Sequence, residues 1–154
     1  MSIEKGMTAK VEDWMAGLLK ALTYNDTLVF KTAEPWNYQL ESLSESIGRY
    51  EPFVFVGFSP SSPQREGDYE LCQNLRFELI FGVASKEKGV ARRGDASHLG
   101  ASKIRDLIIT AINGKHPGDG FDCDNFYFSG DIEYFESPKQ YAAGLQFEAK
   151  WFSE

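Results

Sequence analysis

Residues 75–83 have the sequence LRFELIFGV, which is the clearest structural pattern in the chain. Apolar side chains occupy every second position: Leu75, Phe77, Leu79, Phe81 and Val83. Between them lie Arg76, Glu78 and Gly82. Because successive side chains of a β-strand point to opposite faces of the sheet, this stretch predicts a strand with one face in a hydrophobic core.

Two more strands are predicted upstream of this one. Residues 53–58, FVFVGF, form a continuous apolar run between Pro52 and Pro60, a pattern typical of a strand that is covered on both faces. Residues 28–32 have the β-branched and aromatic content of a short strand, which Pro35 is expected to stop. Residues 59–70 are polar and rich in proline, and we expect a long loop there.

Two amphipathic helices are predicted. The first follows Thr8, a plausible N-cap, and its apolar residues recur at helical spacing: Val11, Trp14, Met15, Leu18, Leu19 and Leu22. The second has a similar apolar face, formed by Ile104, Leu107, Ile108, Ala111 and Ile112. Gly114 and Pro117 are expected to end it. A short helical turn is also expected between Leu40 and Tyr50.

The C-terminal part predicts two strands, over residues 126–135 and 145–151, joined by a hairpin turn at residues 136–139 that contains Pro138. The order of elements is helix, strands, helix, strands. We therefore expect an α+β fold in one domain, residues 1–154, with an antiparallel or mixed sheet packed against two main helices.

The composition excludes several classes of protein. The formal net charge of -7 disfavours direct recognition of nucleic acid, because phosphates would be repelled. The first six residues lack the features of a secretory signal, and no apolar run is long enough for a membrane helix, so we expect a soluble chain that does not enter a membrane. Cys72 and Cys123 are far apart, which favours reduced thiols in a cytoplasm.

No pattern for a metal, a cofactor or catalysis emerges. Residues 119–125 contain three aspartates, but they do not match the spacing of a calcium-binding loop. His98 and His116 have no partner at metal-ligand spacing. Residues 89–94 do not form a phosphate-binding glycine loop. We therefore expect no cofactor, no metal and no catalytic residue, and the protein is not expected to be an enzyme.

One charged cluster is a candidate contact surface. Four basic side chains fall within a polar connection at residues 85–100: Lys86, Lys88, Arg92 and Arg93, followed by Asp95. In an acidic protein this cluster makes a local positive patch that can meet an acidic surface of another copy or another protein. The alternative is a loop that is only solvated.

The same region carries a resemblance. The segments GVAS at residues 82–85, GVARRG at 89–94 and GASKIRDL at 100–107, which continues to AING at 111–114, resemble the Mu-like phage tail terminator family. In that family a strand is followed by an Arg-Arg-Gly loop and by a helix that opens and closes on glycine. Residues 59–70 and 119–124 have no counterpart in it.

The resemblance implies a structural protein of the virion tail that is assembled in the cytoplasm of a bacterial host. Its copies would form a ring, typically of six, that caps the tail tube and joins it to the head. The implied partners are other copies of the chain, the tail tube or sheath protein, and the head–tail connector protein.

Two other interpretations remain open. The first is a small-ligand-binding α+β domain of non-viral function, with some of the many aromatic side chains lining a pocket between the sheet and the helices. The second is a hydrolase that uses carboxylates such as Glu78 and Glu148 on facing strands, although nothing in the sequence positions them.

Overall fold

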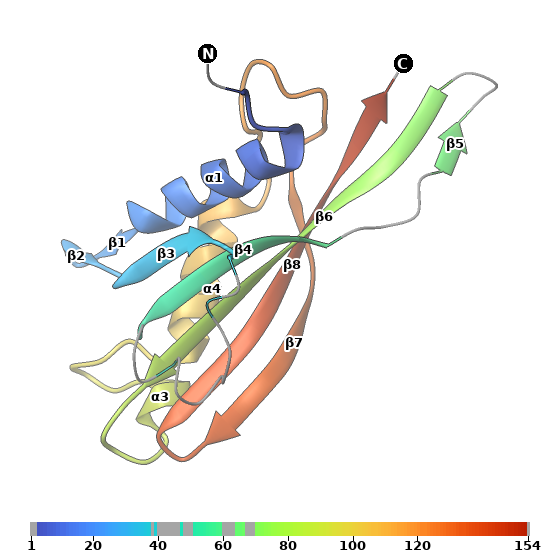
Figure 1. The fold of residues 1–154 in the computed structure, drawn as a ribbon. Helices are drawn as coiled ribbons and strands as arrows, with labels where there is room; N and C mark the ends of the chain where they lie inside the picture. The colour runs from blue at the N-terminus through green and yellow to red at the C-terminus, as the bar shows by residue number, and fades with distance from the viewer. Residues whose placement is uncertain are drawn as a thin grey trace.

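The strand predicted at residues 75–83 is the centre of the sheet. In the computed structural model, which describes residues 3–37, 39, 47, 51–59, 64–66 and 70–153, this strand runs from residue 70 to residue 84. The strand order is β3-β4-β6-β8-β7, and β5 pairs with β6 (Figure 1). The helices are α1 (Met7–Lys20), α3 (Val90–Arg93) and α4 (Ala101–Ile112). The strands are β1 (Thr23–Tyr24), β2 (Thr27–Leu28), β3 (Thr32–Pro35), β4 (Phe53–Ser59), β5 (Gln64–Glu66), β6 (Glu70–Ala84), β7 (Tyr127–Ser137) and β8 (Gln140–Ser153).

The α+β class is confirmed, and the sheet is mixed. β3 lies parallel to β4, whereas β6 is antiparallel to β4, β5 and β8, and β7 is antiparallel to β8. The predicted hairpin has a tighter turn than expected, because Ser137 pairs with Gln140 and leaves only Pro138 and Lys139 between the strands. Figure 1 shows β6 and β8 continuing together well past the other strands, with β5 at their end.

The prediction of one strand at residues 28–32 is wrong. Asn25 and Asp26 have positive φ angles and form the tight turn between β1 and β2. Val29 and Phe30 follow, and both are buried in the core outside any strand. Their apolar side chains fill the core beneath α1 instead of extending a ladder. β3 then begins at residue 32 and ends at Pro35, which sits on an edge strand where a missing N–H group is tolerated.

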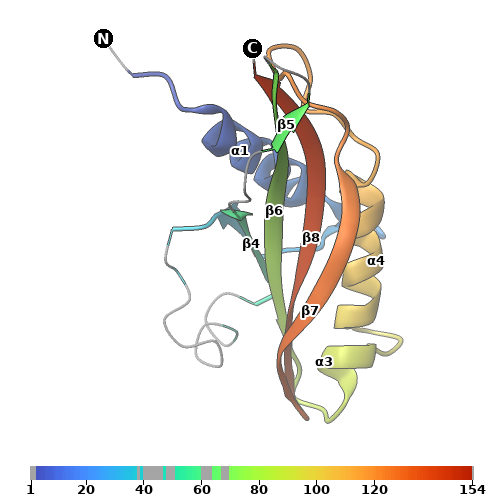
Figure 2. The same cartoon turned by 90° about the vertical axis from the view of Figure 1, so that its right-hand side faces the viewer.

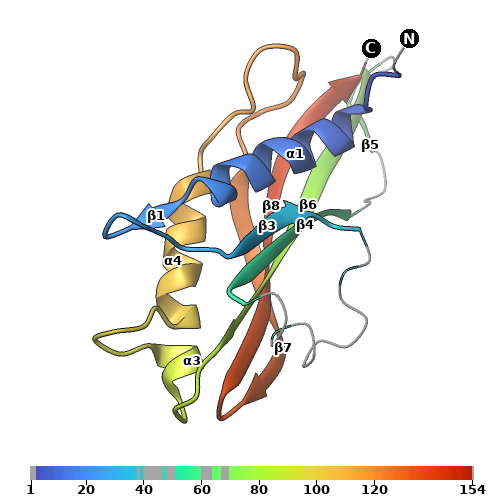
Figure 3. The same cartoon turned by 60° about the vertical axis from the view of Figure 1, so that its left-hand side comes forward.

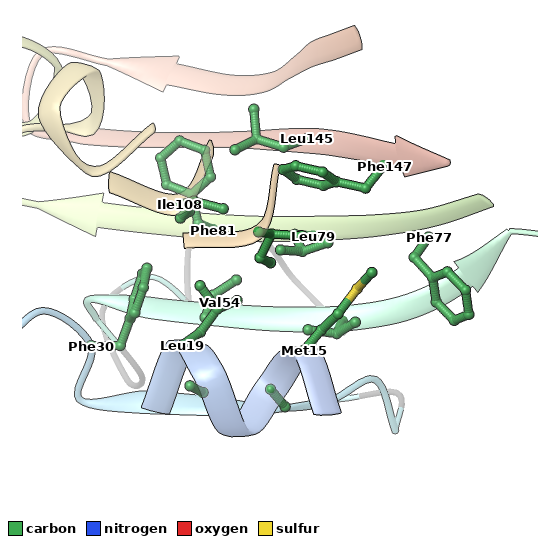
Figure 4. Close-up of a cluster of buried hydrophobic side chains, with 14 of the residues drawn as sticks. Met15, Leu19, Phe30, Val54, Phe77, Leu79, Phe81, Ile108, Leu145 and Phe147 are labelled. Atoms are coloured by element: carbon green, nitrogen blue, oxygen red, sulfur yellow. The ribbon is translucent and has the colours of Figure 1, made fainter. Parts of the chain in front are cut away.

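Both main helices pack on one face of the sheet. The side chains of Met15 and Leu19 from α1 and Ile108 from α4 meet alternate residues of β4, β6 and β8 in a single cluster (Figure 4). Figure 3 shows α1 crossing the strands, and α4 lies alongside β7 in Figure 2. α1 begins two residues earlier than expected, with Gly6 and not Thr8 at the N-cap. Gly114 has a φ of +78° just after α4, as its predicted end requires.

The other face of β4 is also buried, as its continuous apolar sequence predicted. Phe53 and Phe55 form a second cluster there with Ala142 of β8 and Ile47. Ile47 is the one residue of the expected helical turn at 40–50 that the structure describes; the rest of that turn lies outside the described residues. The second cluster covers only one end of this face, so the polar residues farther along β6 and β8 remain accessible.

Two predicted loops contain regular structure. Residues 64–66 form β5 within the expected loop at 59–70, while residues 60–63 and 67–69 lie outside the described residues. The polar connection at residues 85–100 contains the short helix α3. None of the helices in the described part of the chain is both long and apolar enough to cross a membrane.

Candidate functional site

The five residues predicted as a contact surface lie in and around the short helix α3. Lys86 and Lys88 are exposed in the connection between β6 and α3. Arg92 and Arg93 form the last turn of α3, and Asp95 follows the helix. All five residues are exposed, and their individual surroundings decide what each can contact.

Arg92 and Arg93 have different surroundings. Arg92 Nη1 lies 3.7 Å from Glu136 Oε1 on β7 and is thus part of the protein's own charge network. Arg93 lines a cleft on another side of α3 and forms no ion pair within the described ranges of the chain. Arg93 is accordingly the better candidate for an intermolecular contact.

Asp95 organises the loop that follows α3. Its Oδ1 accepts hydrogen bonds from the backbone N–H groups of Ser97, at 2.8 Å, and His98, at 2.9 Å, and lies 3.1 Å from Nδ1 of His98. The hydrogen bond from Ser97 and the contact with His98 lower the pKa of the Asp95 carboxyl. Its own loop therefore satisfies the hydrogen-bonding capacity of this carboxylate, which keeps its negative charge and lines the same cleft as Arg93.

A cleft of about 760 Å³ lies between the β1–β2 hairpin and the loop after α3; we call it the hairpin cleft. Tyr24 and Leu28 of the hairpin, 38% and 60% exposed, form its apolar wall. Arg93 and Lys103 form its basic wall. Lys103 Nζ lies 5.2 Å from the centre of the Tyr24 ring, so the two walls meet through a cation–π contact.

Glu51 lies at the base of the hairpin cleft beside Pro52. Its Oε2 atom is buried and has no hydrogen-bond partner in the described part of the structure. Burial raises the pKa of the Glu51 carboxyl, although the positive charge of Lys31 opposes this shift. The cleft thus combines two cations, two carboxyl groups, one of which is partly desolvated, and an apolar surface.

A second exposed surface lies on β7, at the opposite edge of the sheet from β3 (Figure 1). Tyr127, Ile132 and Tyr134 are 55%, 44% and 43% exposed. The Tyr134 hydroxyl donates a hydrogen bond to Glu78 on β6, and burial together with this carboxylate raises the pKa of Tyr134 to about 12. We call these three residues the apolar face of β7.

The helix-side face of β7 is acidic and carries Asp131, Glu133 and Glu136. Asp131 accepts a hydrogen bond of 2.7 Å from Arg105 of α4, and Glu136 faces Arg92. A hydrogen bond with Glu136 raises the pKa of Glu133, because the two carboxyl groups share one small region. Three carboxyl groups near two guanidinium groups leave a surplus negative charge on what we call the acidic face of β7.

The aspartate-rich segment at residues 119–124 is held by its ends. His116 accepts a hydrogen bond from the N–H of Gly118, at 2.9 Å, and its Nε2 lies 2.8 Å from the carbonyl oxygen of Cys123. Burial and the neighbouring aspartates raise the pKa of Cys123 to about 11. No group of three or more potential metal ligands occurs among the residues that the structure describes.

The carboxylates of the hydrolase interpretation do not face each other as a pair. Glu148 Oε1 accepts a hydrogen bond of 2.6 Å from Arg76, its cross-strand neighbour, while Glu78 accepts from Tyr134. Each carboxylate is therefore engaged by a different partner, and no arrangement of an acid and a base is formed between them.

Sequence reasoning missed Tyr24, Leu28, Lys103 and the apolar face of β7. One sequence signal could have found Tyr24 and Leu28. They flank the Asn25-Asp26 turn, and exposed turns often carry contact residues. Comparison with known proteins adds no assignment, since no protein-family model and no curated protein matches the sequence.

Proposed function

We propose that this protein is a structural assembly protein, a phage or prophage tail terminator, whose copies associate head-to-tail into a ring. The ring caps the tail tube when its length is complete, and it presents a surface to the head–tail connector. In this role the protein binds other proteins and performs no catalysis. It acts in the virion tail after assembly in the bacterial cytoplasm.

The observation that carries the proposal is the placement of the exposed apolar side chains. Apart from Ile3, the large apolar residues that are exposed in the described ranges form two groups, one on the β1–β2 hairpin and one on β7. These groups lie at opposite edges of the protomer (Figure 1). A closed ring needs two different surfaces on each copy, because each contact joins unlike patches.

The test is deletion of the gene from its phage or prophage, followed by electron microscopy of the particles. Abnormally long or headless tails that return to normal when the gene is restored are expected. Particles of normal tail length and infectivity would refute the proposal. Negative-stain microscopy of the purified protein at high concentration provides a second measurement, in which closed rings are expected.

The hairpin cleft supports a second candidate, the binding of a small ligand. Its volume of about 760 Å³ lies within the range of ligand pockets, and its charged groups could orient a polar molecule. Native mass spectrometry of the freshly purified protein separates the two functions. A bound small molecule that is lost on denaturation would favour this candidate, whereas a bare oligomer supports the assembly function.

A further inference from the structure

The two walls of the hairpin cleft differ in chemistry. The apolar wall consists of Tyr24 and Leu28, and the basic wall consists of Arg93 and Lys103. Lys31 offsets the charge of Glu51, and Asp95 offsets one of the two cations of the wall, so the basic wall keeps a surplus of one positive charge. A complementary partner must therefore present apolar and anionic groups side by side.

β7 presents these two properties on its two faces. In its pairing with β8, Ile132 lies opposite Gly144, whereas Glu133 lies opposite Ala143 of the helix-side core. The apolar face and the acidic face are thus separated by only the thickness of one strand. β7 is also the last strand of its sheet, and most of its side chains are exposed.

We propose that the hairpin cleft of one copy receives the β7 edge of the next copy, with the basic wall against the acidic face and the apolar wall against the apolar face. This inference rests on the proposed self-association and specifies the contact that produces it. Charge complementarity fixes the orientation of the strand in the cleft, because the reverse orientation would bury charged groups against apolar ones.

The edge of β7 is suited to being held by side chains. Its ladder with β8 contains two irregularities, between Phe128 and Gly130 and between Glu133 and Phe135. Bulges of this kind disturb the regular spacing of backbone groups and oppose simple addition of another strand. Contact through side chains in a cleft does not need a regular ladder, and it avoids unlimited growth of the sheet.

The contact cannot be made by the same patch on both copies. Two hairpin clefts would bring cations against cations, and two β7 edges would bring carboxylates against carboxylates. Each copy therefore uses one surface for each neighbour. The hairpin forms its own two-stranded sheet and lies on the other side of the protomer from β7 (Figure 1), so repetition of the contact leads to a ring or a filament, according to the angle between successive copies.

The test uses two charge-reversed variants of the full chain. One variant, R93E/K103E, makes the basic wall acidic, and the other, E133K/E136K, makes the acidic face basic. Self-association of each variant alone is measured by sedimentation velocity and native mass spectrometry. We expect association to weaken by about tenfold or more in both, because each contact then joins like charges.

Mixing the two variants is the decisive step. The acidic cleft of R93E/K103E then meets the basic β7 of E133K/E136K. The unchanged basic cleft of E133K/E136K meets the unchanged acidic β7 of R93E/K103E, which is the native contact. The mixture is expected to recover assembly as oligomers in which the two variants alternate, with equal numbers of each by mass. K86E/K88E is the matched control, since it makes the same charge change outside the cleft lining and should assemble like the wild type.

Circular dichroism and thermal unfolding establish that each variant is folded before its assembly is scored. Assembly of both variants at wild-type strength, failure of the mixture to recover, or a wild-type chain that stays monomeric at every accessible concentration would overturn this contact. The tail-length phenotype of the gene deletion is scored independently. Rings that form despite both charge reversals would remove the contact and leave the proposed function standing.

Discussion

Arg92 and Arg93 are neighbours in the chain, yet α3 directs them to different environments. Arg92 lies beside Glu136 of β7, at 3.7 Å, whereas Arg93 lines the hairpin cleft without an ion pair to any described residue. Arg92 therefore contributes to the protomer itself, whereas Arg93 is available to another molecule. Sequence alone cannot make this distinction, because both side chains have the same charge and adjacent positions.

Alanine substitution at each arginine should separate these roles. R93A is expected to weaken self-association about tenfold while leaving the melting temperature unchanged, because the side chain is exposed and forms no ion pair with any residue that the structure describes. R92A is expected to have the smaller effect on association, since it acts only by freeing Glu136. Sedimentation velocity and thermal unfolding measure the two quantities. A larger loss of association in R92A would contradict the division.

Replacing Ile132 tests the apolar face of β7. Ile132 is 44% exposed in the protomer, so I132S should cost little stability but weaken association about tenfold through the lost apolar burial. I3S is the matched control, because Ile3 is 96% exposed and belongs to neither apolar patch. Equal association of I132S, I3S and the wild type would show that β7 lies outside the contact.

A glycine in the sheet tests the second core cluster. A Cβ atom at Gly82 would lie 2.6 Å from Cζ of Phe53 and 3.1 Å from Cγ1 of Ile47, so G82A should lower the free energy of unfolding by about 1–3 kcal/mol. G17A is the control, because a Cβ atom at this position in α1 would contact nothing within 4 Å. Alanine there should stabilise the helix by about 0.5–1 kcal/mol. Urea unfolding of both variants measures the difference, and a neutral G82A would be inconsistent with the close packing.

The elements that were predicted correctly are those whose pattern is local. The alternation at residues 75–83 is visible in the sequence, and the structure places this run in the middle of β6. The strand predicted at residues 28–32 was wrong because Val29 and Phe30 have side chains that favour strands but are buried outside any strand. Their conformation depends on the packing of α1 and the sheet, which no short window of sequence contains.

The candidate site was predicted only in part, for a related reason. Arg93 and Asp95 were identified from the local concentration of charge, and both line the hairpin cleft. Tyr24 and Lys103 were missed because nearly 80 residues separate them in the sequence, and only the fold brings them to 5.2 Å. The surplus charge near Glu133 likewise depends on the register of β7 on β8.

Glu12 offers a test of how α1 meets β4. Its Oε2 atom accepts a hydrogen bond of 3.0 Å from the N–H of Phe58, and burial raises the pKa of the Glu12 carboxyl. A raised pKa means that the folded state disfavours the carboxylate, so its contribution to stability falls as the pH rises above the ordinary glutamate range. E12Q keeps an acceptor for Phe58 without a charge. It should be more stable than the wild type at neutral pH and similar in acid; lower stability at both pH values would contradict this.

The pH dependence of assembly follows from the raised pKa of Glu133. Three groups surround this carboxyl: Glu136 on the same strand, Arg92 of α3 and Tyr141 of β8, and the hydrogen bond with Glu136 has the largest influence. In the proposed contact the basic wall of the next copy would lower this pKa, so assembly releases a proton. Association should therefore strengthen as the pH rises from the lower pKa of Glu133 in the complex through its raised pKa in the free copy, and then become constant.

Sedimentation velocity across this pH range measures the effect, and E133Q provides the comparison. The glutamine variant should associate more weakly than the wild type at neutral pH, because it lacks the charge that faces the basic wall. It should also lose most of the pH dependence in this window, since the group that exchanges the proton is gone. If E133Q retained the full pH dependence of the wild type, the proton would have to belong to another group and the acidic face of β7 would not control assembly.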